Sequence, residues 1–325
     1  MKRDLNNLPA ELNCAARIPG EHETMQTSGS LTLHALDGPF GMEAKGVDLS
    51  GKLTTGLRQS LNKALVEQQV LLFRNQQLGD AQIREVASWF GDVRVLPRVR
   101  RKGEEIVPGV RHLTNLGADG RPSGKHPDPF SREWHADGAW MQIPARATVL
   151  YALEVPREGG ATQFADMVGG LEGFNESERG RLDKLEVIHD VELARVLRFG
   201  RAVNINQHVG RKRQLGLWLR FLRRLLPGAT TVHPVIRISP ENGRAAIVLG
   251  ADAWRIRGMG WYRGMREVAR LTQRSVRSEL ILTHYWRPGD LVIWDNRSLL
   301  HRVEDYDFKR EARVMRQVVI CGRTS

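Results

Sequence analysis

Residues 288–301 read PGDLVIWDNRSLLH, in which a short apolar run stands between a Pro-Gly-Asp turn and a second polar turn. Short runs of β-branched and aliphatic residues bounded by turn residues are typical of β-strands. The same pattern recurs upstream and downstream. We predict strands at 147–155, 232–238, 245–249, 290–294 and 314–320. Many short strands separated by turns favour a sandwich or jelly roll over a parallel sheet. The predicted fold is therefore mainly β.

Helices are expected to decorate this β fold. Apolar residues recur at helical spacing in 57–68 and 80–90, and further helical segments are predicted at 174–182 and 260–279. The stretch 95–134 is rich in Arg, Gly and Pro and shows little periodicity, which is typical of a binding loop.

The chain shows no internal repeat, low-complexity tract or linker, so a single domain is predicted for residues 31–325. Residues 1–30 are polar and weakly periodic, and we interpret them as a loose N-terminal arm. An insertion that acts as a lid is predicted at about 196–231.

Composition narrows the class of protein. The 325 residues hold only two cysteines, Cys14 and Cys321, and no signal-peptide core follows Met1, so we expect a cytoplasmic protein without a disulfide framework. A net charge of +12 attracts anions in general. Nucleic acid, an acidic membrane surface and small carboxylate substrates all remain open on charge alone.

One cluster of residues points to metal chemistry. His135 and Asp137 lie two positions apart, so on extended backbone both side chains share one face. His301 supplies a second imidazole far downstream. Two nitrogens and one oxygen form the facial triad that leaves three positions open on iron(II). A His-x-Asp pair by itself is weak evidence, since the chain has 10 histidines and 37 acids, and a hydrogen-bonded surface pair is the alternative.

The sequence around this cluster resembles the family of taurine and 2,4-dichlorophenoxyacetate dioxygenases, the TauD/TfdA family, over about residues 31–322. Five segments match in the family's order: 70–76 with 90–92, 134–137, 159–162, 233–237 with 240–244, and 294–301.

The resemblance implies a double-stranded β-helix (jelly roll) core and oxidation of a C–H bond, with Fe(II) as cofactor and 2-oxoglutarate and O2 as co-substrates. Succinate and CO2 would be released. It also implies that Thr162 and Arg313 bind 2-oxoglutarate. Arginine suits this task because its planar fork binds a carboxylate through two hydrogen bonds. Strand alternation places Arg313 and Gln317 on one face and Arg316 on the other.

The substrate is less defined by the sequence. In taurine dioxygenase a loop histidine and a second arginine hold the sulfonate, and the matching positions here are Leu96 and Gln317. We therefore expect Leu96, Arg98, Ser131 and Gln317 to border a substrate pocket. A small molecule bearing a carboxylate or an amine, in a biosynthetic or catabolic pathway, is the predicted substrate.

Segment 209–226 mixes basic and apolar residues and resembles a membrane-surface helix. A lid or a contact in a homo-oligomer is favoured over membrane binding. His233 is expected to make a structural hydrogen bond, and His112 and His126 to be solvated loop residues. A protein that binds or demethylates nucleic acid is the alternative function. An aromatic share of only 6% disfavours it, because base-stacking platforms need aromatic side chains.

Overall fold

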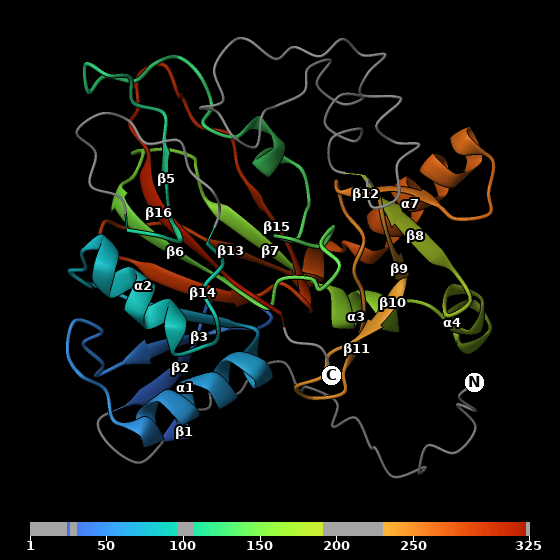
Figure 1. Ribbon diagram of the computed structural model, residues 1–325, viewed down its shortest axis with the longest axis horizontal. Coiled ribbons are helices and arrows are strands. Elements are labelled where there is room, and N and C mark those ends of the chain that lie inside the picture. Colours follow the sequence, from blue (N-terminus) through green and yellow to red (C-terminus); the bar gives the residue numbers. More distant parts are fainter. Residues whose placement is uncertain (1–24, 27–30, 96–106, 191–229, 323–325) are drawn as a thin grey trace.

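A computed structural model describes residues 25–26, 31–95, 107–190 and 230–322 (Figure 1). Its largest feature is an eight-stranded sheet in the order β1-β2-β3-β4-β14-β6-β16-β5. Neighbouring strands are antiparallel except for β3 and β4, which are parallel. The strands are β1 (Met25–Gln26), β2 (Thr32–Ala35), β3 (Met42–Lys45), β4 (Val70–Phe73), β5 (Val110–Thr114), β6 (Ala147–Glu154), β14 (Leu291–Asp295) and β16 (Val314–Ile320).

A three-stranded sheet faces the large sheet and completes the jelly roll. It consists of β13 (Ile281–His284), β7 (Thr162–Asp166) and β15 (Leu299–Val303), in that order. Phe164 of this sheet packs between the two layers against Trp294 of the large sheet, with ring centroids 5.3 Å apart. The mainly β jelly roll predicted from the sequence is confirmed.

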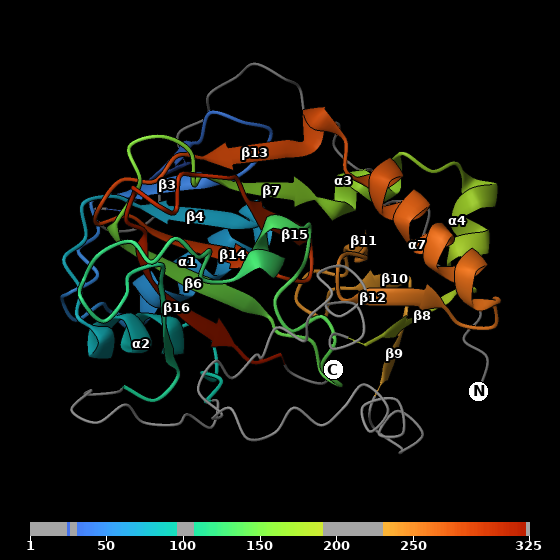
Figure 2. The same cartoon turned by 90° about the horizontal axis from the view of Figure 1, so that it is seen from above.

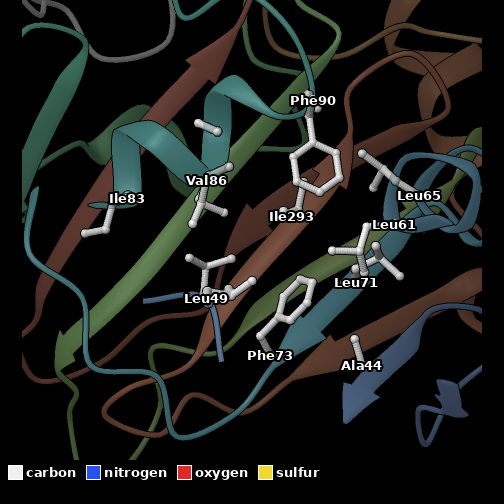
Figure 3. Close-up of a cluster of buried hydrophobic side chains, with 14 of the residues drawn as sticks. Ala44, Leu49, Leu61, Leu65, Leu71, Phe73, Ile83, Val86, Phe90 and Ile293 are labelled. Atoms are coloured by element: carbon white, nitrogen blue, oxygen red, sulfur yellow. The ribbon is translucent and has the colours of Figure 1, made fainter. Parts of the chain in front are cut away.

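Two helices cover the other face of the large sheet: α1 (Thr55–Gln68) and α2 (Asp80–Ser88). Their apolar side chains, including Leu61 and Ile83, belong to one buried cluster with Phe73 and Ile293 (Figure 3). Because side chains alternate along a strand, Ile293 points to this cluster while its neighbour Trp294 points into the jelly roll. Both faces of β14 are thus buried, which explains its continuous apolar run.

The remaining elements build a second apolar core at one end of the jelly roll (Figure 2). They are α3 (Met167–Glu172), α4 (Glu176–Leu182), β8 (Glu186–His189), β9 (Thr231–Pro234), β10 (Ile236–Ile238), β11 (Ala245–Ile247), β12 (Ala253–Ile256) and α7 (Trp261–Ser275). Short 3-10 turns occupy Pro129–Arg132 and Ser278–Leu280. No helix within the described residues is long and apolar enough to cross a membrane.

Several predicted boundaries shift. The strand predicted at 232–238 is divided, because β9 pairs with β8 while β10 pairs with β11. The stretch 95–134, expected to be irregular, contains β5, which pairs with β16 at one edge of the large sheet. The predicted helix 260–279 ends at Ser275. The lid insertion at 196–231 and the segment 209–226 lie almost wholly in 191–229, outside the described residues.

Candidate metal centre and active site

His135 and His301, far apart in the sequence, are joined through their backbones. The His135 N–H donates to the His301 carbonyl at 3.0 Å, and the His301 N–H donates to the His135 carbonyl at 2.8 Å. This reciprocal pair places the two imidazoles side by side, with ring centroids 4.1 Å apart. Both side chains are buried. The backbones that carry the two imidazoles are therefore held together by main-chain hydrogen bonds, independently of the side-chain rotamers.

Asp137 completes the cluster. Its Oδ1 lies 3.9 Å from Nε2 of His135, and its Oδ2 lies 3.8 Å from Nε2 of His301. One ligand atom from each residue falls within 4.8 Å of the others. A metal ion about 2.1 Å from each of three such atoms fits this spacing. The structure brings together the three metal ligands predicted from the sequence.

The protonation of the three groups suits a divalent cation. The Nδ1–H of His135 donates to the Glu133 carbonyl at 2.8 Å, which leaves the Nε2 lone pair free. Burial lowers the pKa of His301 to about 3, so this ring is neutral at physiological pH. Burial raises the pKa of Asp137, but the two histidines and the Thr148 hydroxyl outweigh that effect and hold it below its usual value. Two imidazole nitrogens and one carboxylate oxygen form the donor set of a non-haem iron site.

A hydrogen-bonded chain behind the cluster fixes the Asp137 carboxylate. Trp294 donates from Nε1 to Oδ1 of Asn296 at 2.9 Å, and Asn296 donates from Nδ2 to the Thr148 hydroxyl at 2.9 Å. Thr148 in turn donates to Oδ2 of Asp137 at 2.8 Å. Every acceptor in this chain is satisfied, so the carboxylate is held in one orientation before any ligand binds. The Trp294 ring also lies 4.7 Å from that of His301.

Arg313 is a buried cation that has no carboxylate partner among the described residues. Its side chain is only 3% exposed, and both Nε and Nη2 lack a hydrogen-bond partner within the described residues. Burial lowers the pKa of Arg313 to about 10, which still leaves it charged at neutral pH. An uncompensated buried charge is strongly unfavourable, so this site is built to receive an anion. The far carboxylate of 2-oxoglutarate, as predicted from the sequence, fits it.

Thr162, the other predicted 2-oxoglutarate residue, begins β7 and is fully buried. Its hydroxyl accepts a hydrogen bond from Nε1 of Trp286 at 2.9 Å. A hydroxyl has one proton to donate, and this contact leaves that proton for another acceptor. The structure is compatible with the predicted role, which stays a prediction.

The four residues predicted to border a substrate pocket lie in different surroundings. Leu96 and Arg98 lie in 96–106, outside the described residues. The Ser131 hydroxyl donates to the Asp128 carbonyl at 2.7 Å and stabilises a 3-10 turn. Gln317 donates from Nε2 to Oδ2 of Asp137 at 3.0 Å. Gln317 therefore holds the carboxylate of a predicted metal ligand, a role that was not predicted from the sequence.

Two arginines near the metal cluster were missed by the sequence analysis. Arg111 stands directly opposite Gln317 in the pairing of β5 with β16, and its positive charge helps to lower the pKa of Asp137. Arg94 lies over the Trp140 ring at 5.4 Å. Partial burial lowers the pKa of Arg94, opposed by the attraction of Cys321 and Asp137. No short motif marks these positions, since only the register of β5 and the path of the chain after α2 bring them to the cluster.

The other histidines also have defined places. His233 contacts the Met141 carbonyl at 2.8 Å through Nε2, in agreement with the expected structural hydrogen bond. His112 pairs with Asp80, which also binds Arg316 at 2.9 Å on the outer face of β16. Gln317 contacts Asp137 whereas Arg316 contacts Asp80, so these two side chains point to opposite faces of β16, as strand alternation predicts. His126, expected to be solvated, is instead half-buried.

Comparison with known proteins agrees with this geometry. Residues 32–319 match the family described as "Taurine catabolism dioxygenase TauD, TfdA family". The chain is 28% identical over 309 residues to the (S)-phenoxypropionate/alpha-ketoglutarate-dioxygenase of Delftia acidovorans, covering 92% of this chain and 97% of that protein. It is also 28% identical over 298 residues to the alpha-ketoglutarate-dependent sulfate ester dioxygenase of Pseudomonas putida, covering 90% of each chain.

The crystal structure of AAD-2 in complex with Mn(II) and N-oxalylglycine is a close structural match. Its TM-score is 0.74 and its sequence identity 25%, covering 91% of this chain and 98% of that one.

Proposed function

Because the chain belongs to the taurine catabolism dioxygenase (TauD, TfdA) family and is an Fe(II)- and 2-oxoglutarate-dependent dioxygenase, we propose that it oxidises a C–H bond of a small carboxylate-bearing substrate. The expected outcome is hydroxylation or desaturation, with release of succinate and CO2. The observation that carries the assignment of residues is the cluster of His135, Asp137 and His301, whose ligand atoms lie within 4.8 Å of one another and whose two histidines are buried.

The residues of this chain chiefly bind and orient the metal ion and the co-substrate. His135, Asp137 and His301 would hold the iron, which supplies oxygen activation when bound. Arg313 would pair with the far carboxylate of 2-oxoglutarate and so direct its oxo-acid end toward the metal. Burial of the two histidines limits the access of bulk water to the metal site.

Charge around the cluster favours an anionic substrate over an amine. Arg94 and Arg111 both exert their positive charge at Asp137, and a protonated amine entering beside them would be repelled. Arg111 is partly neutralised by Asp128 at 3.3 Å, whereas Arg94 forms no ion pair with a described residue. The two relatives named above act on phenoxypropionate and on sulfate esters, both of which are anions at neutral pH. We therefore assign the carboxylate alternative to this chain.

The test has two stages. Anaerobic protein loaded with one equivalent of Fe(II) should develop a weak visible charge-transfer band when 2-oxoglutarate is added. His301→Ala should lose the band, while His34→Ala, altered in the distant strand β2, should keep it. Succinate release is then measured across aryloxyalkanoates, alkyl sulfates and alkylamines. Absence of the band from the metal-loaded wild type would contradict the assigned site, and stimulation by amines alone would contradict the anionic substrate.

A further inference from the structure

Four buried polar atoms near the predicted 2-oxoglutarate site lack a hydrogen-bond partner within the described part of the chain. They are Nε and Nη2 of Arg313, the hydroxyl of Tyr306, and Nε2 of His126. Buried polar atoms are almost always paired in folded proteins. Four orphaned atoms in three neighbouring side chains therefore call for a ligand.

All four atoms are hydrogen-bond donors. The guanidinium nitrogens of Arg313 and the Tyr306 phenol carry protons at neutral pH. For His126 the tautomer follows from its contacts, because the Asp128 backbone N–H donates to Nδ1 at 3.1 Å. Nδ1 is then an acceptor, and the single proton of the neutral ring lies on Nε2. The missing partner must accept several hydrogen bonds.

The three side chains lie close together. The rings of His126 and Tyr306 have centroids 5.7 Å apart. Burial and the charge of Arg313 together lower the pKa of His126 to about 4, and Arg313 also opposes the rise in the pKa of Tyr306 that burial causes. The Gly159-Gly160 turn lies close to both Tyr306 and Arg313. A Cβ placed on Gly159 would lie 3.2 Å from Cα of Tyr306, and one on Gly160 would lie 3.7 Å from Cδ of Arg313.

One buried amide fixes this arrangement. Asn115 donates from Nδ2 to the carbonyls of Phe308 at 3.1 Å and Glu311 at 2.8 Å, and its Oδ1 accepts from the backbone N–H of Arg313 at 2.8 Å. The Phe308 ring in turn contacts the rings of His126 and Tyr306, each at a centroid distance of 6.2 Å. The donors are thus positioned before a ligand arrives, which lowers the entropy cost of binding.

We propose that Tyr306 and His126 donate hydrogen bonds, together with Arg313, to the far carboxylate of 2-oxoglutarate. The inference rests on the proposed function and extends it to two residues on loops outside the strands of the jelly roll. A carboxylate offers about four lone-pair sites on two oxygens, so it can accept several hydrogen bonds at once, as the orphaned donors require. With His126 neutral, one arginine balances one carboxylate, and the two neutral donors add selectivity for an oxo acid that carries a second carboxylate.

We expect a loss of binding affinity only for a ligand that carries the far carboxylate. Binding to the Mn(II)-loaded enzyme is measured calorimetrically for 2-oxoglutarate and for 2-oxovalerate, which has a methyl group in place of that carboxylate. Tyr306→Phe and His126→Phe keep the aromatic ring and remove the donor. Each should weaken 2-oxoglutarate binding by about tenfold, the usual scale for a hydrogen bond to a charged group, and leave 2-oxovalerate binding unchanged. The matched control is Tyr262→Phe, which removes an exposed hydroxyl from α7 and should change neither affinity.

Three results would overturn the inference. Unchanged 2-oxoglutarate affinity in both variants would show that the donors do not reach the ligand. An equal loss for 2-oxoglutarate and 2-oxovalerate would indicate a structural role for the two rings. Failure of the wild-type, metal-loaded enzyme to bind 2-oxoglutarate would remove the proposed function as well, and this outcome is separate from the first two.

Discussion

Gln317 donates a hydrogen bond from Nε2 to Oδ2 of Asp137 at 3.0 Å, linking strand β16 to the metal cluster. The same oxygen accepts from the Thr148 hydroxyl at 2.8 Å. Oδ2 is therefore satisfied twice by the protein, whereas no described residue donates a hydrogen bond to Oδ1, which can bind a metal ion. Groups that orient a metal-binding carboxylate in this way influence metal affinity strongly.

Replacing Gln317 with Leu should weaken metal binding by about tenfold or more, because loss of a partner to a ligand typically costs 10- to 100-fold in affinity. The measurement is Mn(II) or Fe(II) titration of the metal-free protein under anaerobic conditions. Gln77→Leu, at an exposed position before α2, is the control and should bind metal normally. Equal affinities for wild type and Gln317→Leu would show that the contact does not support the ligand.

Arg313→Met should reduce 2-oxoglutarate affinity by about one to two decades, since a charge-assisted contact contributes roughly 1.5–3 kcal/mol. The stability of the unliganded protein should not fall together with this affinity. The buried guanidinium has donors without hydrogen-bond partners, and methionine removes them. Thermal melting with and without 2-oxoglutarate separates the two effects, as the ligand should no longer raise the melting temperature. Arg316→Met breaks an ion pair with Asp80 on the outer face of β16, three positions after Arg313, and should keep the ligand-induced shift. Loss of that shift in Arg316→Met alone would move the 2-oxoglutarate contact to Arg316.

Much of the jelly roll follows from local pattern. The strand 314–320 is observed with the predicted bounds, since apolar residues, most of them β-branched, occupy five of its seven positions. The strand β7 was not predicted, since it begins at Thr162 directly after the Gly159-Gly160 turn and its five residues include Gln163 and Asp166. Its extended conformation depends on pairing with β13 and β15 at both edges. Such tertiary support leaves no local signature in the sequence.

The residues of the candidate site likewise divide into those that the sequence predicts and those that only the fold brings together. His135, Asp137 and His301 were found because metal chelation requires particular side chains at restricted spacing. Thr148 and Arg111 were not found, because their proximity to Asp137 depends on strand register alone. A one-residue shift in register would turn each of these side chains to the opposite face.

Gly159→Ala should destabilise the protein more than an ordinary left-handed glycine substitution does. Gly159 has φ of +74°, and a Cβ there would lie only 2.2 Å from the Asp305 carbonyl oxygen. Gly243 has φ of +69° but no atom within 4 Å of its Cβ position, so Gly243→Ala isolates the backbone strain of roughly 1–2 kcal/mol. Chemical denaturation should show a loss for Gly159→Ala at least about 1 kcal/mol larger. Equal losses would mean that the Gly159 turn relaxes freely around the methyl group.

Asp295 gives the fold a defined pH dependence. This carboxyl is buried at the end of β14, and burial raises its pKa to about 6, against the stabilising effects of the Arg297 backbone N–H and the Ser298 hydroxyl. An aspartate in the unfolded chain has a pKa of about 3.9. Between these two values the folded state retains a proton that the unfolded state releases, so the free energy of unfolding falls as pH rises from about 4 to 6.

Asp295→Asn should remove this contribution, because the amide is isosteric and stays neutral at every pH. The amide oxygen can still accept from the Arg297 N–H, which donates to Oδ1 of Asp295 at 2.8 Å in the wild type. The difference in unfolding free energy between variant and wild type should therefore grow in favour of the variant from pH 4 to pH 6. It should then level off, at no more than about 3 kcal/mol. Urea denaturation at intervals across pH 4–8 measures it, with Asp37→Asn on the exposed surface as the control. Parallel curves for Asp295→Asn and wild type would show that the pKa of the Asp295 carboxyl is the same in the folded and unfolded states, because only a difference in bound protons makes the two curves diverge.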